Sequence, residues 1–255
     1  MSVLTSRDNP KVKRWAKLAE DARFRRSEQR ALIEGPHLLA AALGSGHKPL
    51  AILATEEGAA EPEIAELIAK SGLRALLLSR GVFKHVVDAE SPPGVAAEIA
   101  IPSVPKRAAA RVVFLEGVQD PSNVGAIVRS AAAFAVEMVV LDRSCADAWS
   151  PRALRAGMGG HFAVSIAQVD GLSTVLESFQ GRLICAVPRG GQALTQADLK
   201  APIGWVFGSE GQGLSEETLS AVPLQISIPM KGATESLNVA AAAAICLYES
   251  FGRGS

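Results

Sequence analysis

Cysteine is scarce in this sequence, and so are aromatic residues and long apolar runs. The three cysteines, Cys145, Cys185 and Cys246, lie far apart in apolar surroundings, and no CxxC pair or histidine cluster accompanies them. We therefore expect no structural disulfide and no metal site. A reducing, cytoplasmic compartment fits this cysteine usage best.

Signals for a membrane or for secretion are also missing. No apolar run approaches the ~18 residues that a membrane span requires. The first ten residues, MSVLTSRDNP, lack the apolar core of a signal peptide. Net charge is absent as well, because 26 Lys and Arg balance 26 Asp and Glu. Overall charge therefore steers no partner toward this protein.

The charge is nevertheless uneven along the chain. Residues 7–30 contain nine basic and four acidic residues, a net charge of +5. Such clustering occurs on surfaces that bind polyanions, although a solvated helix face is the commoner explanation.

The first hundred residues alternate between short apolar runs and segments of helical spacing. This alternation predicts a small α/β domain with short connections. We expect helices at 11–19, 37–43, 61–71 and 81–88, and strands at 31–34, 50–54, 75–78 and 95–99. Prolines, basic residues and small residues at 101–110 predict a linker between a domain at 1–100 and another at 111–255. A surface loop within one domain is the alternative.

The second half begins with a strand–loop–helix–strand unit. A strand at 111–116 leads into a loop at 117–125 that is dense in turn formers, then a helix at 126–136 and a strand at 138–141. Further strands are expected at 183–187 and 205–207. Ligands of open α/β sheets bind beyond the carboxyl ends of the strands, where this loop lies.

Two further stretches of the second half are distinctive. The glycine-rich loop GSEGQGL at 208–214 is neither GxGxxG nor GxxxxGK[ST], so no dinucleotide site or P-loop is supported. The stretch 228–249 reads as a strand end, a loop and a helix that Ser236 or Asn238 caps. Because Val239–Tyr248 is apolar nearly all round, burial on more than one side is expected. An ordinary buried C-terminal helix would explain that stretch alone equally well.

Three stretches together resemble the signature motifs of the SpoU/TrmH family of RNA 2′-O-ribose methyltransferases, which belong to the SPOUT class. They are LEGVQDPSNVGAIVRSAAAF at 115–134, VFGSEGQGL at 206–214 and IPMKGATESLNVAAAAAICLYE at 228–249. A looser resemblance links SRDNPKVK at 6–13, RALIEGPHLLAAAL at 30–43 and PPGVAAE at 92–98 to the family's RNA substrate-binding domain, which is of ribosomal-protein type.

The resemblance implies a fold, a cofactor and a partner. The catalytic domain is expected to be an α/β fold with a deep trefoil knot, in which the loops at 206–214 and 228–238 cradle S-adenosylmethionine. The resemblance also implies a homodimer formed through the catalytic domain. The residues that it places around the adenine and ribose of the cofactor are Gly208, Ile228, Leu237 and, less directly, Met230.

The same resemblance assigns a reacting centre. Arg129 acts on the ribose 2′-hydroxyl, and the residues around it are Asn123, Glu210, Ser236 and Asn238. The family proposal makes this arginine a general base. Because a guanidinium keeps its proton at ordinary pH, a charged Arg129 that holds the adjacent phosphate and stabilises the alkoxide is physically easier.

RNA contacts are expected from the basic residues of the first half and from one arginine beyond it. The candidates are Lys11, Lys13, Arg14, Arg23, Arg25, Arg26 and Arg155. Gly157 stands where many family members carry serine, which loosens the inference for Arg155.

The leading hypothesis is therefore an RNA 2′-O-methyltransferase that acts on 23S-type ribosomal RNA. A tRNA 2′-O-methyltransferase is one alternative, and a non-catalytic RNA-binding factor for ribosome assembly is another. A nucleotide-dependent oxidoreductase is disfavoured, because the dinucleotide fingerprint is missing.

Overall fold

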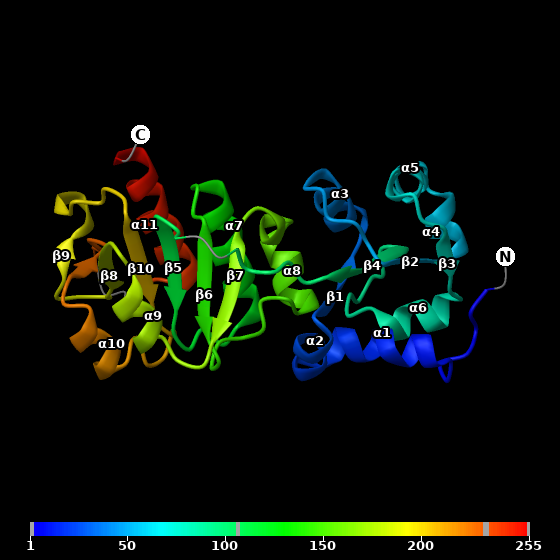
Figure 1. Ribbon diagram of the computed structural model, residues 1–255, viewed down its shortest axis with the longest axis horizontal. Coiled ribbons are helices and arrows are strands. Elements are labelled where there is room, and N and C mark those ends of the chain that lie inside the picture. The colour runs from blue at the N-terminus through cyan, green and yellow to red at the C-terminus, as the bar shows by residue number, and fades with distance from the viewer. Residues whose placement is uncertain (1–2, 106–107, 232–234, 254–255) are drawn as a thin grey trace. The chain divides into compact units, whose positions relative to one another are not determined.

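The computed structural model describes residues 3–105, 108–231 and 235–253, which form two compact units (Figure 1). The first unit comprises Met1–Pro102 and, unexpectedly, Asp147–Phe162. The second comprises Ser103–Ala146 and Ala163–Ser255. The segment 147–162 thus packs within the first unit, although the sequence groups it with the second domain.

The first unit is built on a mixed four-stranded sheet with the order β1-β4-β2-β3. Strand β4 pairs antiparallel with β1 and β2, and β2 pairs parallel with β3. The strands are β1 Arg30–Glu34, β2 Ala51–Ala54, β3 Ala75–Leu77 and β4 Val95–Ala100. The helices are α1 Pro10–Glu20, α2 Ala22–Glu28, α3 Pro36–Gly44, α4 Glu56–Ala60, α5 Pro62–Ser71, α6 Arg80–Val86 and α8 Pro151–Gly157, followed by the short 3₁₀ turn η1 Gly160–Phe162.

Helix α1 covers one face of this sheet with an apolar stripe. Val12, Trp15 and Leu18 recur at helical spacing and are buried with Leu32 of β1 and Phe83 of α6. The Nε1–H of Trp15 donates to the buried Glu98 carboxylate of β4, at 2.9 Å. The core against α1 is therefore mainly apolar, and the buried Glu98 in it is hydrogen-bonded.

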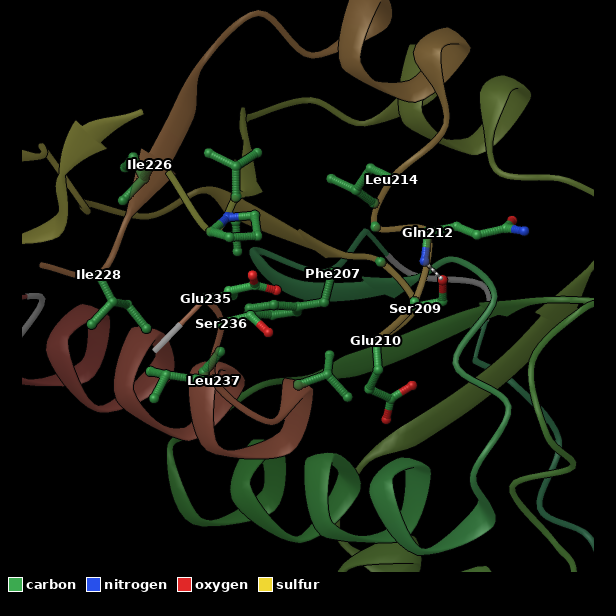
Figure 2. Close-up of a pocket in the computed structure, with 18 of the residues that line it drawn as sticks. Phe207, Ser209, Glu210, Gln212, Leu214, Ile226, Ile228, Glu235, Ser236 and Leu237 are labelled. Carbon is green, nitrogen blue, oxygen red and sulfur yellow. Dashed lines mark hydrogen bonds between the residues drawn. The ribbon is translucent and has the colours of Figure 1, made fainter. Parts of the chain in front are cut away.

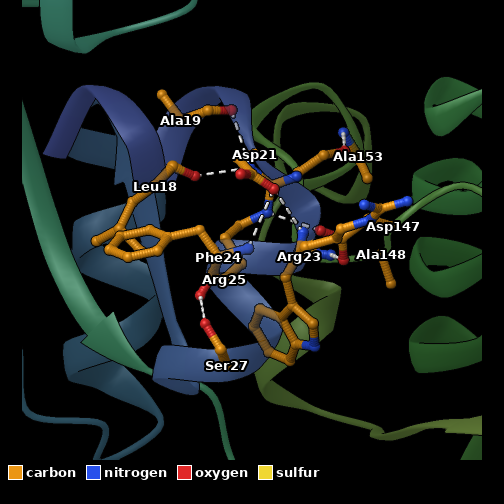
Figure 3. Close-up of polar contacts among 12 residues, drawn as sticks. Leu18, Ala19, Asp21, Arg23, Phe24, Arg25, Ser27, Asp147, Ala148 and Ala153 are labelled. Carbon is orange, nitrogen blue, oxygen red and sulfur yellow. Dashed lines mark hydrogen bonds and ion pairs between the residues drawn. The ribbon is translucent and has the colours of Figure 1, made fainter. Parts of the chain in front are cut away.

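A buried ion pair holds the segment 147–162 within the first unit (Figure 3). Arg25 of α2 is only 3% exposed, and its Nε donates to Asp147 at 2.6 Å. The Nη1 group of Arg25 donates to the carbonyls of Leu18 and Ala19, in the last turn of α1. Arg25 therefore ties α1, α2 and the start of the inserted segment together.

A second ion pair joins α8 to the sheet of the same unit. Arg155 donates to the buried Glu34 of β1 at 3.0 Å and also pairs with Asp88. Burial raises the pKa of Glu34, while the backbone N–H of Asp88 and the charge of Arg155 oppose that rise. The buried His161 of η1 contacts the carbonyl of Ala148 through Nε2 at 2.8 Å, and burial lowers the pKa of His161 to about 4.

The second unit is built on a parallel seven-stranded sheet with the order β7-β6-β5-β10-β8-β11-β9. The strands are β5 Arg111–Leu115, β6 Met138–Asp142, β7 Ser165–Val169, β8 Arg182–Ala186, β9 Gln192–Ala193, β10 Ile203–Phe207 and β11 Gln225–Ser227. The helices are α7 Pro121–Ala133, α9 Ser173–Ser178, α10 Glu216–Ala221 and α11 Val239–Arg253, with the 3₁₀ turn η2 Leu194–Gln196.

Helices cover both faces of this parallel sheet, as burial of its strands requires. On one face, Val112, Phe114 and Val206 form a core with apolar residues of α9 and α10. On the other face, the Nε1–H of Trp205 donates to the Ser250 hydroxyl of α11 at 2.8 Å. Strand β10 is therefore anchored on both faces.

The predicted α/β class is confirmed, and so are most of the predicted strands and helices. The helix after β5 begins at Pro121, however, five residues before the predicted start, because Asp120 caps it and Pro121 occupies the first helical position. Asn123 therefore belongs to the first turn of α7 and not to a loop. Helix α2 was not predicted, because its one buried residue is the charged Arg25.

Removing the partner of Arg25 should destabilise the first unit strongly. Asp147→Asn leaves a buried guanidinium without its counter-charge, and we expect a loss of about 3 kcal/mol in the free energy of unfolding. Chemical denaturation followed by fluorescence measures this loss.

Asp170→Asn provides the control for this prediction. Asp170 pairs with Arg143, but both side chains are more than 70% exposed. Replacing Asp170 should therefore leave the free energy of unfolding nearly unchanged. Equal stability of Asp147→Asn and the wild type would show that the buried pair is not needed.

Candidate functional site

A pocket of about 460 Å³ opens at the carboxyl ends of β8, β10 and β11 in the second unit (Figure 2). Three chain segments supply its walls. The lining residues are Ala186–Pro188 from the end of β8 onward, Phe207–Leu214 from the end of β10 onward, and Ile226, Ile228, Met230, Glu235–Leu237, Val239 and Ala242 around β11 and the start of α11, together with Leu219 of α10. Apolar side chains and loop backbone thus dominate the wall.

Gly208 allows the loop after β10 to fold back on itself. A Cβ atom built at Gly208 would lie 2.2 Å from the backbone carbon of Gly213. The turn is closed by the N–H of Ser209 donating to Gly213 and the N–H of Gly213 donating to Ser209, at 3.1 and 3.0 Å. The loop's own backbone therefore excludes a side chain at this position.

The structure brings together most of the residues that the resemblance selects. Gly208, Ile228, Met230 and Leu237, the four cofactor candidates, all line the pocket, and so do Glu210 and Ser236. Figure 2 shows Ile228, Leu214 and Leu237 around the pocket and the Glu210 carboxylate directed toward the helix beneath it. The pocket is also lined by Val187, Pro188 and Phe207, which were not selected from the sequence. The available signal for them was their position at the end of a predicted strand.

A chain of hydrogen bonds links three of the catalytic candidates beside the pocket. The side-chain amide of Asn123 in α7 donates to the Glu210 carboxylate. The Asn238 amide donates to the side-chain carbonyl of Asn123 at 3.0 Å. The Asn238 carbonyl in turn accepts from the N–H groups of Ala240 and Ala241. The predicted cap of α11 is therefore confirmed, and the same residue holds Asn123.

Arg129 lies two turns beyond Asn123 on α7, where its side chain is exposed. It forms no hydrogen bond or ion pair with any residue that the structure describes. Ser236 is also exposed and lines the pocket wall. Both side chains are therefore available to a ligand.

The three cysteines supply no nucleophile for this site. All three are free and buried, and burial raises the pKa of each thiol to about 12. A thiol with such a pKa is protonated at neutral pH, whereas the thiolate is the reactive form. Among the described residues, no group of His, Cys, Asp or Glu is arranged to hold a metal ion.

The candidate RNA contacts of the first unit differ in how exposed their side chains are, and one of the exposed ones, Lys13, pairs with Asp8. Lys11, Lys13, Arg23 and Arg26 are exposed. Arg25, in contrast, is buried against Asp147, and Arg14 pairs with Glu28 and Glu98. Arg155 pairs with Glu34 and Asp88. The charges of these three arginines thus serve contacts within the unit, and Arg25 has almost no surface to offer RNA.

Comparison with known sequences gives one consistent result. The model of the SpoU rRNA methylase family matches residues 110–248, and the model of the MRM3-like substrate binding domain matches residues 9–97. An uncharacterized tRNA/rRNA methyltransferase of Synechocystis sp. is 36% identical over 98% of this chain and 93% of its own length. The 23S rRNA (guanosine(2553)-2′-O)-methyltransferase RlmP of Bacillus subtilis is 31% identical over 97% of this chain and 98% of its own length.

Solved structures agree with the sequences. An RNA 2′-O ribose methyltransferase superposes with a TM-score of 0.83 at 30% identity, covering 99% of both chains. An S-adenosylmethionine-bound rRNA methyltransferase from Sinorhizobium meliloti has a TM-score of 0.83 at 26% identity and covers 98% of this chain and 97% of its own. The predicted SPOUT-type fold with an N-terminal substrate-binding domain is thereby confirmed, and the chain belongs to the SpoU rRNA methylase family.

Proposed function

We propose that this protein transfers a methyl group from S-adenosylmethionine to the 2′-hydroxyl of a ribose in 23S-type ribosomal RNA. The observation that carries the proposal is that Gly208, Ile228, Met230 and Leu237 line one pocket, with the hydrogen-bonded chain from Glu210 to Asn238 beside it. The names of relatives such as RlmP support ribosomal RNA as the substrate.

The pocket suits this cofactor in size and charge. Its volume of about 460 Å³ lies within the roughly 300–1,000 Å³ that is usual for small-molecule sites. Glu210 and Glu235 line it, and none of its described lining residues is Lys or Arg. A wall with two carboxylates and no cation favours a cationic sulfonium over the phosphates of a dinucleotide.

Binding would use the loop backbone and the apolar wall. The backbone of 208–213 would meet the polar edges of the nucleoside, and Ile228 and Leu237 would shield the adenine from water. When bound, S-adenosylmethionine supplies a methyl group that the sulfonium centre activates.

The reacting hydroxyl is a weak nucleophile, so the chain's own residues must orient it and stabilise the charge that develops on its oxygen. Asn123 is held on both sides, by Glu210 and by Asn238, so its amide is already fixed before RNA arrives. Arg129 is exposed on the same helix and carries a permanent positive charge. We assign it to the ribose oxygen and the adjacent phosphate, as an electrostatic stabiliser and not as a base.

RNA recognition is assigned to the first domain, 1–100, and catalysis to 111–255, with 101–110 as the linker. The two family models match 9–97 and 110–248, which supports this division. The exposed Lys11, Lys13, Arg23 and Arg26 are the proposed contacts to the phosphate backbone.

The C-terminal helix is proposed as a homodimer interface. Ile245, Tyr248 and Phe251 of α11 are exposed by 41%, 63% and 40%, and Tyr248 and Phe251 contact the ring of Phe134. Exposed apolar residues that gather in one place favour association with another protein surface.

No described helix is long and apolar enough to cross a membrane. We propose a cytoplasmic location because the proposed substrate is ribosomal RNA.

Methyl transfer to RNA tests the function directly. With methyl-labelled S-adenosylmethionine, we expect label to enter 23S rRNA and not tRNA, and calorimetry should show binding of S-adenosylhomocysteine. Label in tRNA alone would support the tRNA alternative. A folded chain that binds no S-adenosylhomocysteine would be an RNA-binding factor without turnover.

Arg129→Ala should slow methyl transfer by at least about a hundredfold, because it removes the charge that stabilises the developing oxyanion. Affinity for S-adenosylhomocysteine should change little, since Arg129 does not line the pocket. Arg143→Ala, which removes another exposed arginine of the same unit, is the matched control. Transfer by Arg129→Ala at the wild-type rate contradicts the assigned role.

Light scattering at micromolar concentration tests the interface. We expect the wild type to have twice the mass of one chain, and Tyr248→Glu to be monomeric because it places a charge in an apolar contact. Tyr248→Phe keeps the ring and should remain dimeric. A monomeric wild type would contradict the proposed homodimer interface.

A further inference from the structure

Glu116 occupies an unusual position between two loops of the second unit. It is the residue after β5, and its carboxylate accepts three hydrogen bonds from the start of α10. The N–H and the hydroxyl of Ser215 donate to it at 3.0 and 2.7 Å, and the hydroxyl of the buried Thr218 donates at 3.0 Å. Hydrogen bonds to a carboxylate are among the stronger ones in proteins.

These contacts fix both ends of the pocket loop 208–214. The loop leaves β10 after Phe207, whose carbonyl accepts the backbone N–H of Glu116 at 2.9 Å. It ends before Ser215, which the Glu116 carboxylate holds. One residue therefore sets the span that the loop must bridge, through its backbone at one end and its side chain at the other.

The loop between these ends contributes seven consecutive residues to the pocket wall but has little support of its own. Within it, the described backbone hydrogen bonds are the two between Ser209 and Gly213, and the Ser209 hydroxyl accepts the N–H of Gln212 at 3.2 Å. Three of the seven residues are glycines, which raise the conformational freedom of the segment, and outside it the Glu210 side chain is held by Asn123. The fixed ends thus matter more for its shape than its internal contacts.

We propose that Glu116 is a positioning residue that holds the loop 208–214 in the shape that binds the cofactor. The inference rests on the proposed function for the identity of that cofactor. Glu116 does not line the pocket, so it acts through Ser215 and Thr218 and not by contact with the ligand.

The hold of Glu116 on the loop 208–214, which we call the clamp, can be measured without any ligand, by hydrogen exchange of the loop amides. In Glu116→Gln, one of the two acceptor oxygens becomes an NH2 group, so the side chain loses its negative charge and can no longer accept the Ser215 N–H and both hydroxyls through two oxygens. Exchange at the N–H groups of Ser209 and Gly213 should become at least tenfold faster. Glu137→Gln is the matched control, because the Glu137 carboxylate accepts the N–H of Ala110, away from the loop 208–214, and does not line the pocket.

The consequence for the reaction is a split between binding and turnover. In Glu116→Gln, the KM for S-adenosylmethionine should rise at least tenfold, while kcat at saturating cofactor stays within twofold. Thr218→Val removes the hydroxyl that donates to Glu116 and should also raise the KM for S-adenosylmethionine. The double variant should be no worse than Glu116→Gln alone, because the two residues act as one unit.

Several outcomes would overturn the inference. Loop exchange in Glu116→Gln at the wild-type rate contradicts the clamp, and so does a fall in kcat with an unchanged KM. If Glu116→Gln does not fold, normal loop exchange and a normal KM in Thr218→Val reject it. A wild-type chain that binds no S-adenosylhomocysteine rejects the proposed function instead, and loop exchange still decides whether Glu116 holds the loop.

Discussion

The site depends on the place of β10 between β5 and β8. Residues 203–207 pair in parallel with 111–115 on one side and with the strand that starts at Arg182 on the other. Because parallel strands end at the same edge of a sheet, the loops that follow β5 and β10 emerge together. Glu210 can reach Asn123 only because of this pairing, since the two residues lie far apart in the sequence. The polar chain is thus a consequence of strand order.

Local signals in the sequence were sufficient for much of the fold and part of the site. The cap at Asn238 and the glycine-rich loop after β10 each depend on a few neighbouring residues, and each is present in the structure. Neighbouring residues also indicate the early start of α7. Asp120-Pro121 repeats the pattern of a capping residue followed by proline that begins α1 at Asn9-Pro10 and α8 at Ser150-Pro151. That signal was available and was not used.

Long-range contacts could not be read in the same way. Nothing near Arg25 in the sequence indicates Asp147 as its partner, and a cluster of arginines gives no sign of which one is buried. The packing of 147–162 in the first unit follows from that pair and from Arg155 with Glu34. Gly208 shows a related limit. The sequence marks this glycine as a candidate, and it does line the pocket, but the contact with Gly213 that excludes a side chain there appears only in three dimensions.

The polar residues of the site differ in how closely their structural and chemical roles are joined. Asn238 caps α11 and also holds Asn123, so replacing it disturbs a helix start as well as the reacting centre. Asn123 is likewise engaged on both sides of its amide. Arg129 has no such duty among the described contacts, since its side chain is exposed and bonds to no described residue. A side chain that the fold leaves unused can direct its full charge at a ligand. The effect of replacing Arg129 therefore reports on chemistry more directly than the effect of replacing either asparagine.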